Sequence, residues 1–165
     1  MKDHFIEQAD YQHWASTELF RCLDHLSDEQ RKANIGLFFH DIHTTVDHIL
    51  IVTRNWHARL SGEFGKVTSY DKLLYPEWEE LKPAVLDEFA RLKAWLTQKT
   101  PDWFGGVIEF PDADGGSEHV TVTDGLNHVM THAVHHRGQI SAVCTRLHAP
   151  CPEMDFIIYR AKRSP

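Results

Sequence analysis

The chain has 165 residues, enough to bury a core without disulfides or a structural metal, and we expect a single domain over residues 1–165. The 17 lysines and arginines are outnumbered by 24 aspartates and glutamates, and the net charge of -7 argues against nucleic-acid and anionic-membrane binding. The three cysteines lack CxxC spacing, and no apolar N-terminal run or membrane-length stretch occurs. We therefore expect a soluble, cytoplasmic protein with no membrane partner.

The first half of the chain predicts two helices. Apolar residues at three- and four-residue steps predict an amphipathic helix over residues 4–26 that stops near Ser27. The same spacing predicts a second helix over residues 40–61, and Gly62 and Gly65 are its stop signal.

The second half predicts two further helices with a β-hairpin between them. A helix is expected over residues 76–99, where Pro83 either kinks it or marks its true start. Alternating residues around "DADGG" predict a short hairpin over residues 105–120, the only β signal in the chain. Thr121, with Asp124 three residues later, caps a last long helix over residues 121–148. The closing residues are expected to cross the bundle and end in a short apolar turn.

The stretch "THAVHHRGQI" in the last helix contains three histidines, two of which lie on the side that faces the core. At about 100° per residue, His132 and His136 point inward, His128 points further out and His135 furthest. A single buried histidine is usually a neutral core residue held by a hydrogen bond. Two inward histidines one turn apart can instead converge on one ion, so this pair favours a metal site. We interpret His128 as a supporting or surface group.

The second helix offers the third ligand. His48 and His57 fit the helical spacing of the apolar residues almost equally well. His48, however, is the first residue of the apolar run "HILIV", where desolvation keeps an imidazole neutral and able to bind metal. We therefore choose His48 and interpret His40 and His43 as cap or surface histidines. Cys144 is excluded from this ion, because eight residues beyond His136 correspond to about 12 Å along the helix.

Other residues near the histidine cluster have less specific signals. Gln139 lies on the ligand side and can orient a ligand, whereas Arg137 points away and is expected to form a structural ion pair. Trp56 and Trp14 are candidates for the wall of a substrate cavity, although inward aromatic residues are more often plain core. Gly138, inside the helix, indicates either the close approach of another helix or a tolerated glycine.

The segments "TTVDHILIVTRNWHARL" and "LNHVMTHAVHHRGQI" resemble the two hallmark segments of DinB-like proteins, in the superfamily that includes thiol-dependent S-transferases. The resemblance implies an all-α, four-helix bundle of up-down-down-up arrangement with a hairpin before the last helix. It also implies a homodimer and one divalent metal ion bound by His48, His132 and His136. Asp47 is a departure, since many relatives have asparagine before the first ligand.

A metal with three histidine ligands and open positions is typical of catalytic rather than structural sites. The resemblance implies an enzyme that activates a low-molecular-weight thiol, as S-transferases do. Histidine ligands accept zinc, nickel, iron or copper, and we expect zinc or nickel, with iron as the other candidate. A metal-dependent hydrolase and a non-catalytic, metal-binding stress-response module are the alternatives.

An HD-type phosphohydrolase, suggested by His40 and Asp41, or a hemerythrin-like carrier would bind two ions. We expect protons to displace the metal near pH 6.5.

Overall fold

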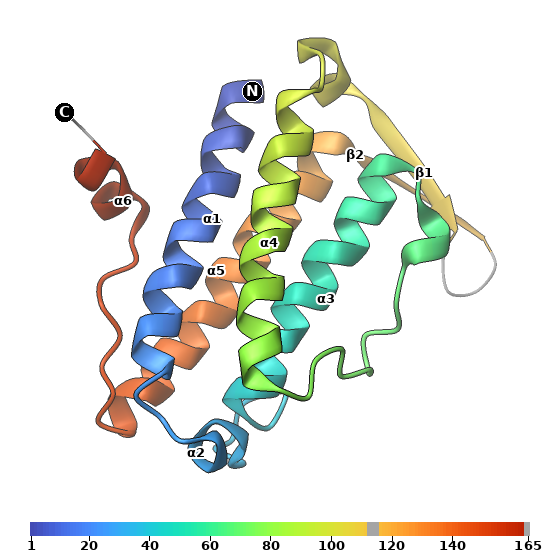
Figure 1. Cartoon of the computed structure of the whole chain (residues 1–165). Coiled ribbons are helices and arrows are strands. Elements are labelled where there is room, and N and C mark those ends of the chain that lie inside the picture. Colours follow the sequence, from blue (N-terminus) through green and yellow to red (C-terminus); the bar gives the residue numbers. More distant parts are fainter. Residues whose placement is uncertain (112–115, 164–165) are drawn as a thin grey trace.

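Four long helices pack into a bundle in the computed structural model, which describes residues 1–111 and 116–163. They are α1 (Lys2–Leu23), α3 (Ile42–Ser61), α4 (Trp78–Thr97) and α5 (Val122–Arg146). Helices α1 and α5 run in one direction and α3 and α4 in the other, as Figure 1 shows, so the up-down-down-up arrangement is confirmed. The long connection over residues 62–77 returns the chain to the end from which α3 started, which allows α3 and α4 to run parallel (Figure 1).

Side chains at the helix ends explain where α3, α4 and α5 begin and end. The Asp41 carboxylate accepts a hydrogen bond from the Thr44 amide and caps α3, and the Thr121 hydroxyl caps α5 in the same way. Gly62 ends α3 with a φ of 78°, a left-handed conformation that favours glycine. Pro83 lies inside α4, five residues after its first residue, so it does not mark the start of that helix.

The shorter elements connect and cover the ends of the bundle. They are α2 (Asp28–Lys32), η1 (Phe64–Lys66), η2 (Pro101–Gly105), β1 (Val107–Pro111), β2 (Ser117–Thr121) and α6 (Phe156–Arg163). Helix α2 was not predicted: Ser27 accepts a hydrogen bond from the Gln30 amide, and the Gln30 side chain accepts one from the Ser27 amide. This capping box begins a new short helix where the sequence indicated only a stop.

The predicted hairpin is confirmed as an antiparallel pair, β1 and β2, in which Val107 lies opposite Thr121. Most of its "DADGG" turn, residues 112–115, lies outside the described part of the chain. Phe110 is the buried residue of β1, and its ring packs against Trp56 of α3 at a centroid distance of 5.8 Å. The hairpin is therefore attached to the bundle through α3.

The core lies between the four long helices, on the apolar faces that the three- and four-residue spacing predicted. Its largest fully buried side chains include Leu19, Leu23, Ile42, Leu50, Ile51, Leu81, Phe89, Leu92, Leu96 and Leu126. None of the described helices is both long and apolar enough to cross a membrane.

Arg137 of α5 and Trp14 of α1 lie in surroundings that differ from those the sequence predicted. Arg137 is buried but forms no ion pair with any described residue; its guanidinium lies 5.5 Å from the centre of the Tyr11 ring, and burial lowers its pKa. Trp14 packs with Tyr11 and Tyr159 in a small apolar cluster under α6. The ion pair predicted for Arg137 is therefore wrong, and Trp14 belongs to this cluster rather than to a cavity near the histidines.

Gly125 and Gly138 of α5 differ in the space available for an added side chain, and this difference can be measured as a change in stability. A Cβ atom at Gly125 would lie 3.0 Å from Trp56 Cζ3, whereas at Gly138 no described atom outside its own helix comes within 4 Å. We expect Gly138→Ala to stabilise the protein by about 0.5–1 kcal/mol, because alanine is the better helix former. Gly125→Ala should fail to gain this amount, because Trp56 must move. Urea unfolding followed by circular dichroism compares them, and equal stabilisation would contradict the close contact at Gly125.

Candidate metal centre

Helices α3 and α5 bring three imidazole rings together inside the bundle. The Nε2 atom of His132 lies 3.2 Å from Nε2 of His48 and 3.1 Å from Nε2 of His136. His136 is buried, and His48 and His132 are partly buried. No further histidine, cysteine, aspartate or glutamate among the described residues joins this group.

The spacing of the nitrogen atoms fits a bound metal ion. Two nitrogen ligands at about 2.0–2.1 Å from one ion, at a tetrahedral angle, lie about 3.3 Å apart. Hydrogen bonding alone does not satisfy the group, since Nε2 of neutral His132 carries either a proton or a lone pair and cannot donate to one neighbour while accepting from the other. An ion placed among the three rings accepts all three lone pairs, so His48, His132 and His136 fit the predicted ligand set.

Gln139 holds the ring of His136 in the orientation that a ligand needs. Nδ1–H of His136 donates to the Gln139 side-chain oxygen at 2.8 Å. The proton is thereby placed on Nδ1, and the lone pair on Nε2 points to the other two rings. The sequence predicted that Gln139 orients a ligand, and its contact with His136 is of the kind that this role requires.

The surroundings keep the three imidazoles neutral. Burial, with repulsion from His136, lowers the pKa of His48 to about 4. Burial and the neighbouring histidines lower the pKa of His132 to about 3, and burial also lowers the pKa of His136. The rings therefore hold free lone pairs at neutral pH. Because these pKa values are lowered, we now expect protons to compete with the metal at a pH below the value of 6.5 that ordinary histidines predict.

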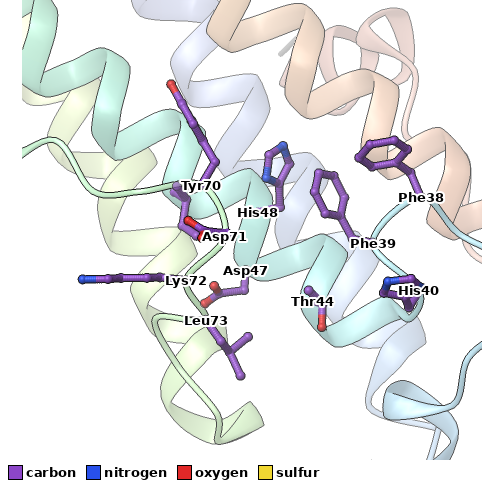
Figure 2. A pocket seen from close by; sticks show the side chains of 11 residues that line it. Phe38, Phe39, His40, Thr44, Asp47, His48, Tyr70, Asp71, Lys72 and Leu73 are labelled. Atoms are coloured by element: carbon purple, nitrogen blue, oxygen red, sulfur yellow. The ribbon is translucent and has the colours of Figure 1, made fainter. Parts of the chain in front are cut away.

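A pocket of about 460 Å³ lies against His48. The ring of Phe39 stacks on the His48 ring at a centroid distance of 3.8 Å, and Tyr70 lies on the other side at 6.3 Å. Figure 2 shows His48 between these two aromatic residues, with the connection that carries Lys72 and Leu73 forming the opposite wall. The pocket thus has one of the three imidazoles as part of its lining.

Comparison with known proteins identifies the family of the chain. The family model described as DinB family matches residues 1–163. The chain belongs to the DinB family. It is also similar to Protein DinB of Bacillus subtilis (strain 168), with 24% identity over 169 residues, covering 96% of this chain and 95% of that protein.

Asp47 ties the wall of the pocket to the helix that carries His48 in this DinB-family protein. Its side chain is 1% exposed, and its carboxylate oxygens accept hydrogen bonds from the amides of Leu74 and Tyr75 at 2.9 and 3.1 Å. Burial raises the pKa of this carboxyl group, and the two hydrogen bonds oppose that shift. The sequence marked Asp47 as a departure from the family pattern but did not reveal this anchoring contact.

Replacing Asp47 by asparagine tests that anchor. Asparagine keeps one acceptor oxygen but turns an amide NH₂ group toward a second backbone N–H, so we expect a loss of about 1–3 kcal/mol in the free energy of unfolding. The matched control is Asp71→Asn, which changes an exposed carboxylate in the connection to which Asp47 is bonded. Urea unfolding of both variants gives the comparison, and equal stability of the two would show that the anchor contributes nothing.

His128 and Trp56 lie beside the metal group rather than in it. The rings of His128 and His132 are 5.4 Å apart, and those of His128 and Trp56 are 5.1 Å apart. His128 is exposed, in agreement with its interpretation as a supporting or surface group. Trp56 contacts the site through His128 and is otherwise packed against the hairpin, so the structure gives it a packing role.

The remaining histidines of α3 have other partners. Nδ1 of His57 lies 2.7 Å from a carboxylate oxygen of Glu88, a contact that lowers the pKa of this buried carboxyl. The choice of His48 over His57 therefore agrees with the geometry. His43 is 1% exposed and its Nε2 lies 2.7 Å from the Tyr75 carbonyl oxygen, so its interpretation as a cap or surface residue is wrong. Its partner lies in a connection that helical periodicity does not describe.

His40 and His135 are both exposed, as predicted. His40 has a φ of 70° and precedes the cap of α3. Neither residue belongs to the three-imidazole group.

Proposed function

We propose that this DinB-family protein is a metal-dependent enzyme that activates a thiol. His48, His132 and His136 would hold one divalent ion, zinc or nickel, with iron as the other candidate. The observation that best supports an enzyme is the position of His48. It belongs both to the group of converging imidazoles and to the lining of the adjacent pocket. A low-molecular-weight thiol bound in the pocket would lie next to the metal group.

The donor set suits chemistry rather than a purely structural role. Three neutral nitrogen donors leave coordination positions for a substrate, whereas structural zinc normally has four protein ligands. When bound, a divalent ion lowers the pKa of a coordinated thiol or water, so that a nucleophile forms at neutral pH. Phe39 holds the His48 ring by stacking, and Gln139 fixes the proton of His136 on Nδ1. Together they keep two donors in place before a substrate arrives.

The pocket indicates the kind of substrate. Phe38, Phe39, Ile51 and Leu73 contribute apolar surface, while Lys72 and Asp71 place charged groups at its edge. A small molecule with an aliphatic thiol arm and a charged end fits such a lining better than a macromolecule does.

Thioether formation tests the proposal. Protein loaded with zinc or nickel is incubated with low-molecular-weight thiols and an electrophile, and the product is quantified by mass spectrometry. We expect a metal-dependent rate that the double variant His132→Ala, His136→Ala lacks. Leu73→Trp, which narrows the pocket, should raise KM without changing the metal content.

The same protein assayed with ester, amide and phosphoester substrates separates the alternatives. Metal-dependent hydrolysis without thioether formation would replace the S-transferase proposal by a hydrolase. Full metal loading with neither activity would support a non-catalytic metal-binding module. Two bound ions per chain in this group would contradict the mononuclear site on which each of these proposals depends.

A further inference from the structure

Three thiols converge at the opposite end of α5 from the hairpin. Cys22 lies in the last turn of α1, Cys144 in the last turn of α5, and Cys151 in the segment that follows α5. Their sulfur atoms all lie within 4.8 Å of one another, and those of Cys22 and Cys151 are 3.0 Å apart. Cys22 and Cys144 are buried, while Cys151 is partly exposed.

The end of α5 is shaped so that Cys151 returns to the other two thiols. His148 adopts a φ of 58°, an unusual left-handed conformation for a residue with a side chain, and reverses the chain. The Ala149 amide then donates to the Cys144 carbonyl oxygen at 2.9 Å. The Ala149 carbonyl oxygen accepts a hydrogen bond from the Cys22 thiol at 2.8 Å. One turn of chain thus joins all three cysteine-bearing segments.

This cluster is separate from the three histidines. Cys144 follows His136 by eight residues, which corresponds to about 12 Å along the helix axis. The two groups therefore offer different donors at different levels of the bundle, nitrogen in one and sulfur in the other.

A disulfide bond would account for the proximity of two of the three thiols but not for that of the third. Sulfur donors select soft ions, among them Cu(I) and zinc. Structural zinc is almost always four-coordinate, and no fourth histidine, cysteine or carboxylate among the described residues approaches these sulfurs. Three sulfur donors without a fourth ligand favour Cu(I), which accepts a low coordination number.

We propose that Cys22, Cys144 and Cys151 form a second metal site, which binds one Cu(I) ion through sulfur. Cys151 is the point of entry, because it is partly exposed while the other two cysteines are buried. Each thiol that becomes a thiolate ligand releases one proton to solvent as its Cu–S bond forms, and copper stays in the +1 state throughout.

The thiols of Cys22 and Cys151 are protonated at neutral pH, so Cu(I) must displace their protons. Burial, with the hydrogen bond to Cys151, raises the pKa of Cys22 to about 12. The hydrogen bond to Cys144, together with burial, raises the pKa of Cys151 as well.

Anaerobic titration with Cu(I) against a competing copper chelator tests the site. The whole chain carrying His132→Ala and His136→Ala is used, so that the imidazoles do not compete. We expect one Cu(I) per chain with sulfur neighbours in the X-ray absorption spectrum. Adding Cys144→Ala should weaken binding more than about tenfold, since even residues that only support metal ligands change affinity by 10–100-fold.

Two controls keep the outcome interpretable. Val143→Ala removes a buried side chain next to Cys144 without removing sulfur and should leave Cu(I) affinity unchanged. Cys151→Ser, in the segment after α5, should weaken binding without disturbing a helix, and it replaces Cys144→Ala if that variant does not fold.

Several results would overturn the proposal. One is equal Cu(I) affinity with and without Cys144, and another is copper bound to nitrogen instead of sulfur. A third is a Cys22–Cys151 disulfide that forms in air, lowers the intact mass by two hydrogens and needs no Cys144. Failure of the thiol site to bind Cu(I) would leave the proposed function of the three-histidine site intact, because the two sites share no ligand.

Discussion

Replacing His132 by alanine is expected to weaken zinc or nickel binding by more than about 100-fold, because the substitution removes a ligand rather than a supporting residue. His132 is the most informative of the three ligands, since its Nε2 lies 3.2 Å from that of His48 and 3.1 Å from that of His136. Competition of the metal-loaded protein against a chromophoric chelator measures the change in Kd.

His135→Ala is the matched control for His132→Ala. It removes an imidazole from the same helix, three residues away, but from the exposed side. We expect its Kd to stay within about twofold of the unchanged protein, in line with the small effects of surface substitutions. If both variants lost affinity equally, the exposed His135 would be as important for metal binding as His132, which would contradict the inward three-histidine group.

Lowering the pH is expected to leave the metal bound at about pH 5.5 and to release it near pH 4, which is close to the pKa of His48. A hundredfold excess of free metal over Kd stabilises the folded state by about 2.7 kcal/mol. For a chain of this size that amounts to a rise in Tm of about 5–10 °C. Melting curves with and without chelator at about pH 7.5, 5.5 and 4 measure how this rise changes.

The metal-free protein should lose stability over part of the same range. The pKa values of His48 and His132 in the folded state, about 4 and about 3, lie below the ordinary value of 6.5. The unfolded chain therefore binds protons first, and the free energy of unfolding falls as pH decreases below about 6.5. The loss levels off below the folded-state pKa values. A metal-dependent rise in Tm that vanished between about pH 7.5 and 5.5 would contradict the buried site, since it would require imidazoles with ordinary pKa values.

Helical periodicity predicted the architecture well because each long helix buries one apolar stripe. The stripe through Leu126, Ala133 and Ile140 fixed the face of α5, and His136 on that face is buried as expected. The capping residue Thr121 and the stop signal Gly62 act through short-range hydrogen bonds and backbone geometry, so they too were readable from the sequence.

The parts that the sequence did not reveal depend on connections without periodicity. The aromatic wall of the pocket comes from Phe39 and Tyr70, which lie in such connections, and the anchor of the second connection is the buried carboxylate of Asp47. His43 was misplaced for the same reason, since its partner is a backbone carbonyl of that connection. The thiol cluster was also missed, because Cys22 and Cys151 are far apart in sequence and meet only through the turn after α5.

Anomalous diffraction from crystals of the protein loaded with one equivalent of zinc or nickel tests the metal site most directly. Data collected on both sides of the absorption edge locate the ion and identify it. We expect one peak at about 2.0–2.1 Å from Nε2 of each of His48, His132 and His136, with its open side toward the pocket lined by Phe39. A peak at any other group of side chains, or two peaks among these three rings, would contradict the mononuclear three-histidine centre.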